Sequence, residues 1–314
     1  MKLAFILDPL NQIKPYKDSS FAMMEEAVAR GHEIFVMQQQ DVVLAGGEVI
    51  GNVQPLMLTG DSHDWYRTGI AEPVLLNSFD AVLMRKDPPF DMEYIYSTYL
   101  LELAETRGAK VFNGPRAVRD HNEKLATAKY PEFTVPTLVT RDGDLIREFL
   151  AEHRDVILKP LDAMGGSSIF RLRPDDANLS VIIEIMTQLG QRTIMAQRYI
   201  PEIVQGDKRI LLIAGKPAPY SLARIPKLGE TRGNLAVGGT GVAQPLTDRD
   251  REIAESIGPS LAAQGLLLVG LDVIGDYLTE INVTSPTCMQ EIRQQTGFNV
   301  AAMMIDALEH AVAG

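Results

Sequence analysis

Three oxygen-bearing side chains lie close together late in the sequence, in the order Asp272, Glu280 and Asn282. Glu280 and Asn282 are two residues apart, so they share one face of a strand. If the preceding turn spans residues 275–277, Asp272 lies opposite Glu280 and all three side chains meet. Two carboxylates and an amide suit Mg²⁺, which prefers oxygen ligands. A solvated polar strand face is the weaker alternative, because the flanking residues are apolar and buried charges need partners.

A glycine-rich turn follows an apolar run that ends in Lys159 and Pro160. Residues 162–168 read DAMGGSS, in which Gly165 and Gly166 would let backbone N–H groups approach phosphate oxygens. Lys159 would add a positive charge. A tight hairpin with a surface lysine is an equal alternative, because paired glycines mark any tight turn. The flanking strands are too close for a helical crossover, so we expect them to be antiparallel.

Arginines gather in the same part of the chain as the predicted magnesium ligands. Arg209 and Arg224 fall on adjacent predicted strands, and Arg232 falls in the segment 226–241, which has five glycines in sixteen residues. That composition predicts a mobile loop that could act as a lid. Arginines beside a metal-binding face imply an anionic ligand, which a guanidinium binds with two hydrogen bonds. Ordinary surface ion pairs are the alternative for each arginine.

The elements that must position these side chains fall into three units, at residues 1–121, 122–202 and 203–314. In the first, strands and helices alternate, which predicts a parallel sheet with helical crossovers. Its expected strands are 3–7, 33–37, 81–84 and 110–112, with helices at 19–30 (capped by Ser19 and Ser20) and from the cap Asp91 to 107, and a hairpin at 42–58. The second unit has a short helix at 123–129, strands at 137–140, 156–160, 168–172 and 194–200, and helices at 145–153 and ending at 189. The third has strands at 208–214 and 218–224, the loop 226–241, a helix at 248–264, a hairpin around 275–276 and two C-terminal helices. The predicted class is α/β, becoming α+β in the C-terminal part.

Composition excludes several classes of function. The net charge of −11 argues against nonspecific nucleic-acid binding, which needs a basic surface. The single cysteine, Cys288, excludes an intrachain disulfide and is expected to be a buried core residue rather than a nucleophile. No apolar run approaches the roughly 20 residues of a membrane span, and no signal peptide is recognisable, so we expect a cytoplasmic protein without a membrane partner. The glycine fingerprints of Rossmann cofactor sites and Walker NTPases are absent, so an oxidoreductase of the Rossmann type is not supported.

Lys124 and six longer motifs carry a resemblance to a known family. The motifs are DSSFAM (18–23), MRKDPPFD (84–91), ILKPLD (157–162), LARIP (222–226), GETRGNLA (229–236) and TEINVTSPT (279–287). The chain resembles the ATP-grasp ligases and, more narrowly, the bacterial glutathione synthetases. The likeness runs through almost the whole chain, and one departure is Ala163, where the family commonly has glycine in the phosphate turn.

This resemblance implies an ATP-grasp fold behind an N-terminal Rossmann-like pre-ATP-grasp domain. It also implies that ATP, γ-glutamylcysteine and glycine form glutathione, ADP and phosphate through an acyl phosphate, with Mg²⁺ as cofactor and Mn²⁺ as the alternative metal. The implied ATP-binding residues are Lys124, Lys159, Met164, Gly165, Gly166, Ser167, Gln197, Tyr199, Ile200 and Asp207. The implied substrate-binding residues are Arg85, Arg232, Gly233, Asn234, Ser285, Pro286 and Thr287. Arg209, Arg224 and Arg232 are the expected catalytic arginines, Asp272, Glu280 and Asn282 the metal ligands. The family also suggests a homotetramer.

Two other functions remain open at this point. A different ATP-grasp ligase, such as a dipeptide ligase, would share the ATP-binding half and differ around Arg85, Arg232 and the loop 226–241. A nucleotide-binding regulator on the same fold would lack turnover. The complete set of lysine, aspartate, glutamate and asparagine argues against the regulator, because a protein that only binds could lose its metal ligands.

Overall fold

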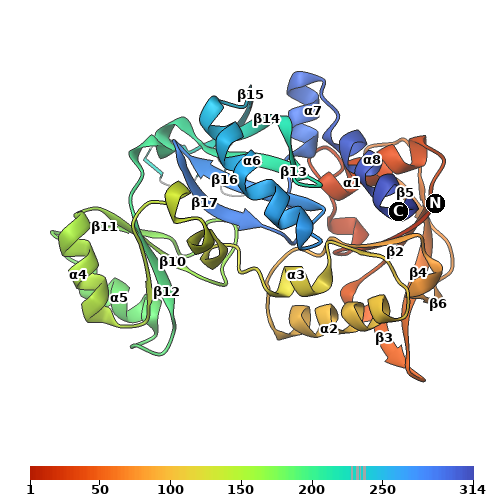
Figure 1. Cartoon of the computed structure of the whole chain (residues 1–314), viewed down its shortest axis with the longest axis horizontal. Helices are drawn as coiled ribbons and strands as arrows, with labels where there is room; N and C mark the ends of the chain where they lie inside the picture. Colours follow the sequence, from red (N-terminus) through yellow and green to blue (C-terminus); the bar gives the residue numbers. More distant parts are fainter. Residues whose placement is uncertain (228, 231–232, 234, 236–237) are drawn as a thin grey trace.

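The computed structural model describes residues 1–227, 229–230, 233, 235 and 238–314 (Figure 1). Three sheets follow one another along its length. In Figure 1 the N-terminal sheet lies on the right, a five-stranded sheet with its covering helix α6 lies in the middle, and a four-stranded sheet with two helices lies on the left.

The N-terminal sheet has the strand order β3-β4-β2-β1-β7-β8, with β5 and β6 paired to β4. Its strands are β1 (Lys2–Ile6), β2 (Glu33–Met37), β3 (Val42–Ala45), β4 (Glu48–Leu58), β5 (Tyr66–Thr68), β6 (Glu72–Leu75), β7 (Ala81–Met84) and β8 (Val111–Phe112). Strands β2, β1, β7 and β8 are parallel, as predicted. Strand β7 is buried throughout, which explains its continuous apolar sequence. The short strands β5 and β6 were not predicted.

Helices α1 (Ser19–Ala29), α2 (Met92–Thr106) and α3 (Pro115–Arg119) complete this part of the molecule. The predicted cap of α1 is wrong by one residue. Asp18 is the cap: its backbone is extended and its carboxylate accepts a hydrogen bond from Phe21 N at 2.8 Å, whereas Ser19 and Ser20 already lie in the helix. The predicted cap Asp91 of α2 is confirmed.

The four-stranded sheet has the order β11-β10-β12-β9, and its paired strands are antiparallel, as expected. Its elements are β9 (Thr137–Thr140), α4 (Gly143–His153), β10 (Val156–Pro160), β11 (Phe170–Leu172), α5 (Leu179–Thr187) and β12 (Ile194–Arg198). We call this sheet with α4 and α5 the small lobe. Strand β11 begins two residues later than predicted, because Ser168 has a positive φ of 55° that interrupts an extended strand.

The five-stranded sheet has the order β15-β14-β13-β16-β17. Its elements are β13 (Asp207–Ile213), β14 (Lys216–Ile225), β15 (Thr240–Pro245), α6 (Asp248–Ala263), β16 (Leu268–Ile274) and β17 (Tyr277–Asn282). Strand β15 was not predicted, and it shortens the expected loop 226–241, because Thr240 and Gly241 pair with Ile225 and Arg224. Within this loop, residues 228, 231–232, 234 and 236–237 lie outside the described residues, so the predicted roles of Arg232 and Asn234 do too.

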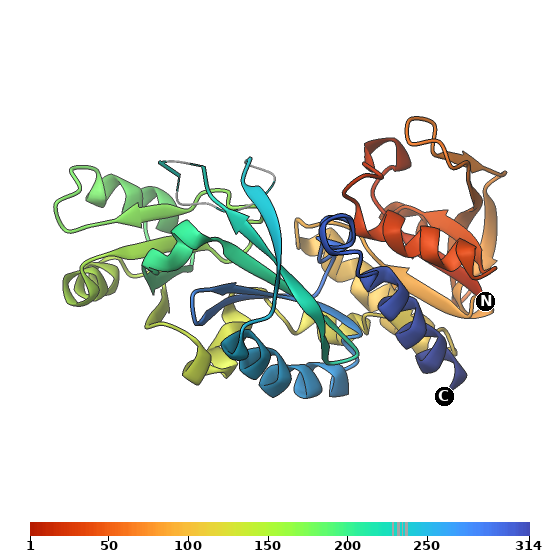
Figure 2. The same ribbon diagram turned by 90° about the horizontal axis from the view of Figure 1, so that it is seen from above.

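The two C-terminal helices, α7 (Met289–Thr296) and α8 (Val300–Ala313), pack against α1. Figure 2 shows α8, in dark blue, alongside α1, in red. Arg30 joins them by donating to Asp306 at 2.6 Å and to Glu309 at 3.1 Å. The last part of the chain therefore returns to the first.

Short 3₁₀ helices fill the connections: η1 (Leu10–Gln12), η2 (Gln39–Asp41), η3 (Leu76–Ser78), η4 (Leu125–Lys129), η5 (Pro131–Phe133) and η6 (Pro201–Gln205). The helix expected at 123–129 is thus the 3₁₀ helix η4. None of the helices within the described part of the chain is long and apolar enough to cross a membrane.

Candidate active site

The β16–β17 hairpin places Asp272 opposite Glu280, as predicted, but by a different route. Ile274 pairs with Tyr277, so the loop has two residues rather than the predicted three. The register then shifts between Val273 and Asp272, which leaves Thr279 as an extra residue on β17. A bulge, not a longer turn, therefore brings the two carboxylates together.

Two arginines hold both oxygens of Asp272. Arg209, directly across from it on β13, donates to Oδ1 at 2.5 Å and to Oδ2 at 3.0 Å. Arg224 lies 2.8 Å from Oδ2 and also pairs with Asp207 at 2.6 Å. All of these side chains except Asp207 are almost fully buried. Although burial opposes it, the two guanidinium groups hold the pKa of Asp272 well below its usual range.

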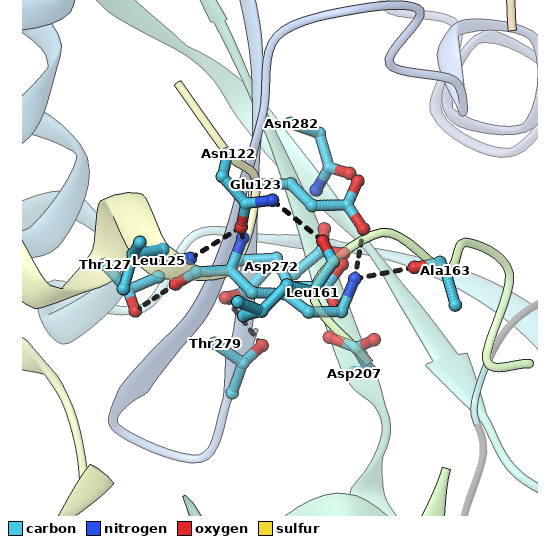
Figure 3. Close-up of polar contacts among 12 residues, drawn as sticks. Asn122, Glu123, Leu125, Thr127, Leu161, Ala163, Asp207, Asp272, Thr279 and Asn282 are labelled. Carbon is cyan, nitrogen blue, oxygen red and sulfur yellow. Dashed lines mark hydrogen bonds and ion pairs between the residues drawn. The ribbon is translucent and has the colours of Figure 1, made fainter. Parts of the chain in front are cut away.

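A second charged group forms around Lys124, whose side chain is 3% exposed. Its ammonium contacts Glu123, donates to Ala163 O at 2.7 Å and lies 3.7 Å from Glu280 Oε1 (Figure 3). Burial and the nearby Glu280 raise the pKa of Glu123 to about 7. Burial works to lower the pKa of Lys124, but Glu280 and Glu123 outweigh it and raise that pKa. Glu123, which contacts this ammonium and raises its pKa, was not predicted from the sequence.

The predicted metal ligands differ in how well they could bind a cation. Glu280 and Asn282 share a face of β17, and Asn282 uses its amide N–H to donate to Gly270 O at 3.4 Å, which leaves its oxygen for a ligand. Asp272 has both oxygens engaged by arginine. Among the described residues, no group of three or more His, Cys, Asp or Glu could hold a metal ion. A carboxylate and an amide therefore fit an oxygen-preferring cation better than Asp272 does in this arrangement.

A cavity between the small lobe and the five-stranded sheet collects most of the predicted ATP-binding residues. We call it the inter-lobe pocket; its charged lining is Lys124, Lys159, Arg198, Asp207 and Glu280. The predicted residues Gly165, Gly166, Ser167, Gln197, Tyr199 and Ile200 also line it, as does Gly233. Met164 does not line it and lines the neighbouring cavity instead.

Lys159 is buried in the wall of this pocket. Burial lowers the pKa of its ammonium. No ion pair or hydrogen bond of Lys159 Nζ is found within the described ranges, which differs from the paired state of Lys124. An anion that entered the pocket would therefore meet a buried ammonium that has no direct partner among these residues, although Glu280 lies close enough to oppose the lowering of its pKa.

One wall of the inter-lobe pocket is apolar. It consists of Ile157, Ile169, Ile200, Ile203 and Ile274. Of these, only Ile200 was predicted from the sequence. Ile157 could have been predicted, because it lies two residues before Lys159 on β10 and so shares its face. A flat apolar ligand group could lie against this wall.

Strand β12 and its continuation form another edge of the pocket. Gln197 Nε2 donates to Thr137 Oγ1 at 3.1 Å, and the Arg171 guanidinium lies 3.5 Å from the centre of the Tyr199 ring. The backbone N–H of Tyr199 donates to Asp155 O at 2.9 Å. Because that N–H is already engaged, a ligand that hydrogen-bonds to the backbone here would have to use the backbone groups on either side of it.

Asp207 has one oxygen that lacks a partner. Arg224 binds Oδ2, but Oδ1 is shielded from solvent and has no hydrogen bond to any residue that the structure describes. Burial raises the pKa of Asp207 to about 6, against the opposing effect of Arg224. Because Asp207 lines the inter-lobe pocket, a hydroxyl donor on a ligand would satisfy this oxygen.

A second cavity, of about 380 Å³, adjoins the first and reaches the connections that follow β1 and β7, and α7. We call it the charged cleft. Its lining includes Lys17, Asp18, Asp87, Glu123, Met164, Arg209, Arg224, Glu280, Asn282, Ser285, Pro286, Thr287, Cys288 and Glu291. Gly165 and Glu280 line both cavities, so the two meet at these residues.

Arg85 lies behind the wall of the charged cleft. It is 6% exposed, donates from Nη2 to Pro286 O at 3.0 Å and from Nε to Ser20 Oγ at 3.1 Å. It thus supports the segment 285–287, in which Ser285 donates to Asp87. Cys288 is buried as predicted, and burial raises the pKa of its thiol, so a nucleophilic role is not favoured.

Comparison with known proteins identifies the family. Residues 1–119 match the family described as "Prokaryotic glutathione synthetase, N-terminal domain", and residues 123–297 match "Prokaryotic glutathione synthetase, ATP-grasp domain". The chain belongs to the prokaryotic glutathione synthetase family. The glutathione synthetase of Nitrosomonas europaea is 65% identical, with 100% of this chain and 99% of that protein covered. That of Ralstonia nicotianae is 63% identical, with 99% and 96% covered.

Solved structures of other ligases share the fold of this glutathione synthetase. D-cycloserine synthetase DcsG superposes with a TM-score of 0.70 at 15% identity, covering 99% of this chain and 100% of that one. The ATP-grasp ligase PsnB, in a complex with its minimal precursor, Mg and ADP, superposes with a TM-score of 0.62 at 18% identity, covering 100% and 98%. The predicted ATP-grasp fold is therefore confirmed, and membership of the family makes the chain an ATP-dependent ligase of the glutathione synthetase type.

Proposed function

We propose that this chain joins γ-glutamylcysteine to glycine at the point where the inter-lobe pocket and the charged cleft meet. The observation that carries the proposal is the convergence of Lys124 and Glu280 with the glycine-rich turn at this junction. One cavity then holds ATP and the other the peptide substrate. The γ-phosphate and the reacting carboxylate would come together at their boundary.

The inter-lobe pocket suits each part of ATP. Its isoleucine wall accepts the adenine ring, and the unpartnered Oδ1 of Asp207 accepts a hydrogen bond from a ribose hydroxyl. Lys124 and Lys159 bind phosphate oxygens, and the backbone of Gly165 and Gly166 closes over them.

Glu280 and Asn282 are the proposed metal ligands, with Asp272 as a third once Arg209 and Arg224 turn to an anionic substrate. Mg²⁺ is the proposed metal and Mn²⁺ the alternative, since both accept oxygen ligands. When bound, the metal neutralises charge on the phosphates.

The reaction follows from positioning and charge stabilisation. An oxygen of the cysteinyl carboxylate attacks the γ-phosphorus, and the bond to ADP breaks. The amine of glycine then attacks the carbonyl carbon of the acyl phosphate, phosphate leaves with the electron pair of the C–O bond, and the nitrogen loses a proton. Arg209, Arg224 and Arg232 are the proposed groups that stabilise the transferring anion.

An acyl phosphate must be kept from water, so the segment 226–241 is the proposed lid. Its Gly233 and Asn234, together with Ser285, Pro286 and Thr287, are the proposed contacts to the peptide substrate. Arg85 acts on that substrate indirectly, through its hydrogen bond to Pro286 O. Assembly as a homotetramer, a cytoplasmic location and the division into units at 1–121, 122–202 and 203–314 stay predictions.

The test is phosphate release from ATP and Mg²⁺, with γ-glutamylcysteine and glycine each omitted in turn. We expect release only when both are present, and glutathione as the product. Release with other amino-acid pairs but not with these would favour the dipeptide ligase. ATP binding without release for any pair would favour the regulator. Glu280→Gln should abolish release, whereas Glu255→Gln, an exposed change on α6, should not.

A further inference from the structure

The glycine-rich turn that follows β10 is attached to neighbouring segments at its base, residues 161–163. Asn122 Nδ2 donates to Leu161 O at 2.8 Å, and Lys124 Nζ donates to Ala163 O at 2.7 Å. Between these two carbonyls, Asp162 forms an ion pair with Arg192, which precedes β12. Residues 164–168 make no hydrogen bond to another segment within the described part of the chain. The turn therefore has an anchored base and a free tip.

The segment 122–124, which supplies two of these anchors, also contacts the strand that carries the proposed metal ligands. Glu123 O accepts a hydrogen bond from Ile281 N at 2.8 Å, and Ile281 lies between Glu280 and Asn282 on β17. Figure 3 shows the bonds that run from this segment to Leu161 and Ala163. Three consecutive residues thus join the base of the glycine-rich turn to β17.

Asn122 is itself held in place by the residues that follow it. Its Oδ1 accepts hydrogen bonds from the backbone N–H groups of Lys124 at 3.1 Å and Leu125 at 2.9 Å, which is a local turn typical of asparagine. The amide nitrogen is left to bond with another segment, and it meets Leu161 O. Asn122 lines neither the inter-lobe pocket nor the charged cleft, so its effect on a ligand is indirect.

ATP binding would change the set of contacts that hold the turn. In the proposed function, Lys124 binds phosphate oxygens, and its ammonium then exchanges Ala163 O for them. The bond of Asn122 to Leu161 O does not involve a phosphate-binding group, so it can keep the base in place while the tip closes. A side-chain carbon at Gly165 would meet nothing within 4 Å, which shows that the tip has room to move.

We propose that Asn122 is a positioning residue that fixes the base of the glycine-rich turn against β17 and so prepares the tip to close over the phosphates of ATP. The inference rests on the proposed function. A turn whose base is already fixed loses less conformational freedom when the nucleotide binds. Loss of this anchor should therefore weaken the binding of ATP and leave the binding of the peptide substrate unchanged.

Two variants remove the donor of Asn122 and keep an oxygen acceptor for the local turn. Asn122→Asp adds a negative charge and Asn122→Ser does not, so an effect common to both reports the lost bond to Leu161 O. We expect each variant to bind ATP with Mg²⁺ about 5–10-fold more weakly in an equilibrium titration, as for one lost hydrogen bond. KM for ATP should rise by a similar factor, and KM for γ-glutamylcysteine should stay as in the wild type.

Hydrogen exchange of residues 161–168 gives a second readout. Without nucleotide, exchange in both variants should be faster than in the wild type, and a non-hydrolysable ATP analogue with Mg²⁺ should reduce the difference. Asn77→Ser is the matched control, because the exposed Asn77 also donates its amide N–H to a backbone carbonyl, Arg107 O, at 2.9 Å. It should change neither ATP binding nor exchange in the turn.

Wild-type ATP affinity in both Asn122 variants, together with wild-type exchange in the turn, would overturn the role of Asn122. Neither readout requires ligation. A wild type that binds ATP but does not join γ-glutamylcysteine to glycine would overturn the proposed function instead.

Discussion

Lys159 of the small lobe and Asp272 of the five-stranded sheet are both charged and both buried near the same junction, but only one of them is paired. Asp272 is bound by Arg209 and Arg224, its neighbours within the sheet. Lys159 faces the inter-lobe pocket without an ion pair among the described residues, and burial lowers its pKa. The charge of Asp272 is thus balanced within the five-stranded sheet, whereas the ammonium of Lys159 in the small lobe depends on a ligand for a partner.

This difference separates two ways of preparing a site for an anion. The paired arginines are neutralised and held near the site before substrate arrives, and they exchange Asp272 for the anion when it binds. An unpaired buried ammonium destabilises the ligand-free protein and is stabilised when phosphate binds. Removal of the buried charge should therefore affect stability in opposite directions at Lys159 and at Asp272.

The largest expected effect is on catalysis. Lys159→Met should lower kcat/KM for ATP by roughly 10²–10³-fold, because it removes a cation from the phosphate site. The same change should leave the ligand-free protein as stable as the wild type or more so, since a buried unpaired charge is lost. Phosphate release and urea unfolding measure the two effects. Lys216→Met, at an exposed lysine of β14, is the control. A clear loss of stability in Lys159→Met would show that the ammonium is paired after all.

The opposite response is expected for the five-stranded sheet. Asp272→Asn removes the carboxylate that Arg209 and Arg224 share and leaves Arg224 with Asp207 alone. It should lower the free energy of unfolding by about 3–5 kcal/mol. Urea denaturation measures this. Asp64→Asn removes a carboxylate from the exposed pair with Arg67 and should leave the unfolding midpoint unchanged. Equal effects of the two aspartate changes would contradict the internal balance proposed for this sheet.

Glu123 lies between the two regions and should give a smaller effect that depends on pH. Its pKa is about 7 in the folded protein and 4.5 in its ordinary state. Between these values the folded state binds more protons than the unfolded state, so stability falls as pH rises through this window. The contribution is at most about 3 kcal/mol. Asp207, with its pKa raised to about 6, acts in the same direction at lower pH.

The free energy of unfolding of Glu123→Gln should therefore decline less between pH 5 and pH 7 than that of the wild type. Urea denaturation at each pH measures both. A parallel decline in the two proteins would mean that Glu123 is ionised throughout this range. Glu105 provides a comparison outside the site, because burial and Glu102 raise its pKa to about 7 as well.

The parts of the structure that a local pattern decides were predictable from the sequence. The parallel strands, the antiparallel small lobe and the pairing of Asp272 with Glu280 were all predicted from periodicity and spacing. The bulge at Thr279 was not, because one extra residue leaves no local signal. The partners of Asp272 were also missed, since Arg209 lies 63 residues away and meets it only through the pairing of β13 with β16.

The errors around the site have the same origin. Strand β15 has little apolar character, and its pairing with β14 decides its structure. The apolar wall of the inter-lobe pocket draws on both lobes, so single isoleucines such as Ile274 look like ordinary core residues in the sequence. Charge pairs and pocket walls that join distant segments depend on topology more than on any motif.

The packing of α8 against α1 has a consequence for synthesis of the chain. Met23 and Met24 of α1 share a hydrophobic core with Ile305 and Leu308 of α8. During translation, α1 leaves the ribosome long before α8, so this apolar face has no permanent cover while the intervening residues are made. The N-terminal sheet can form early in synthesis, but the outer face of α1 is covered only when residues 300–313 form α8. Slow translation of the last third of the chain would prolong the time during which a nascent protein exposes that surface to chaperones or to other nascent chains.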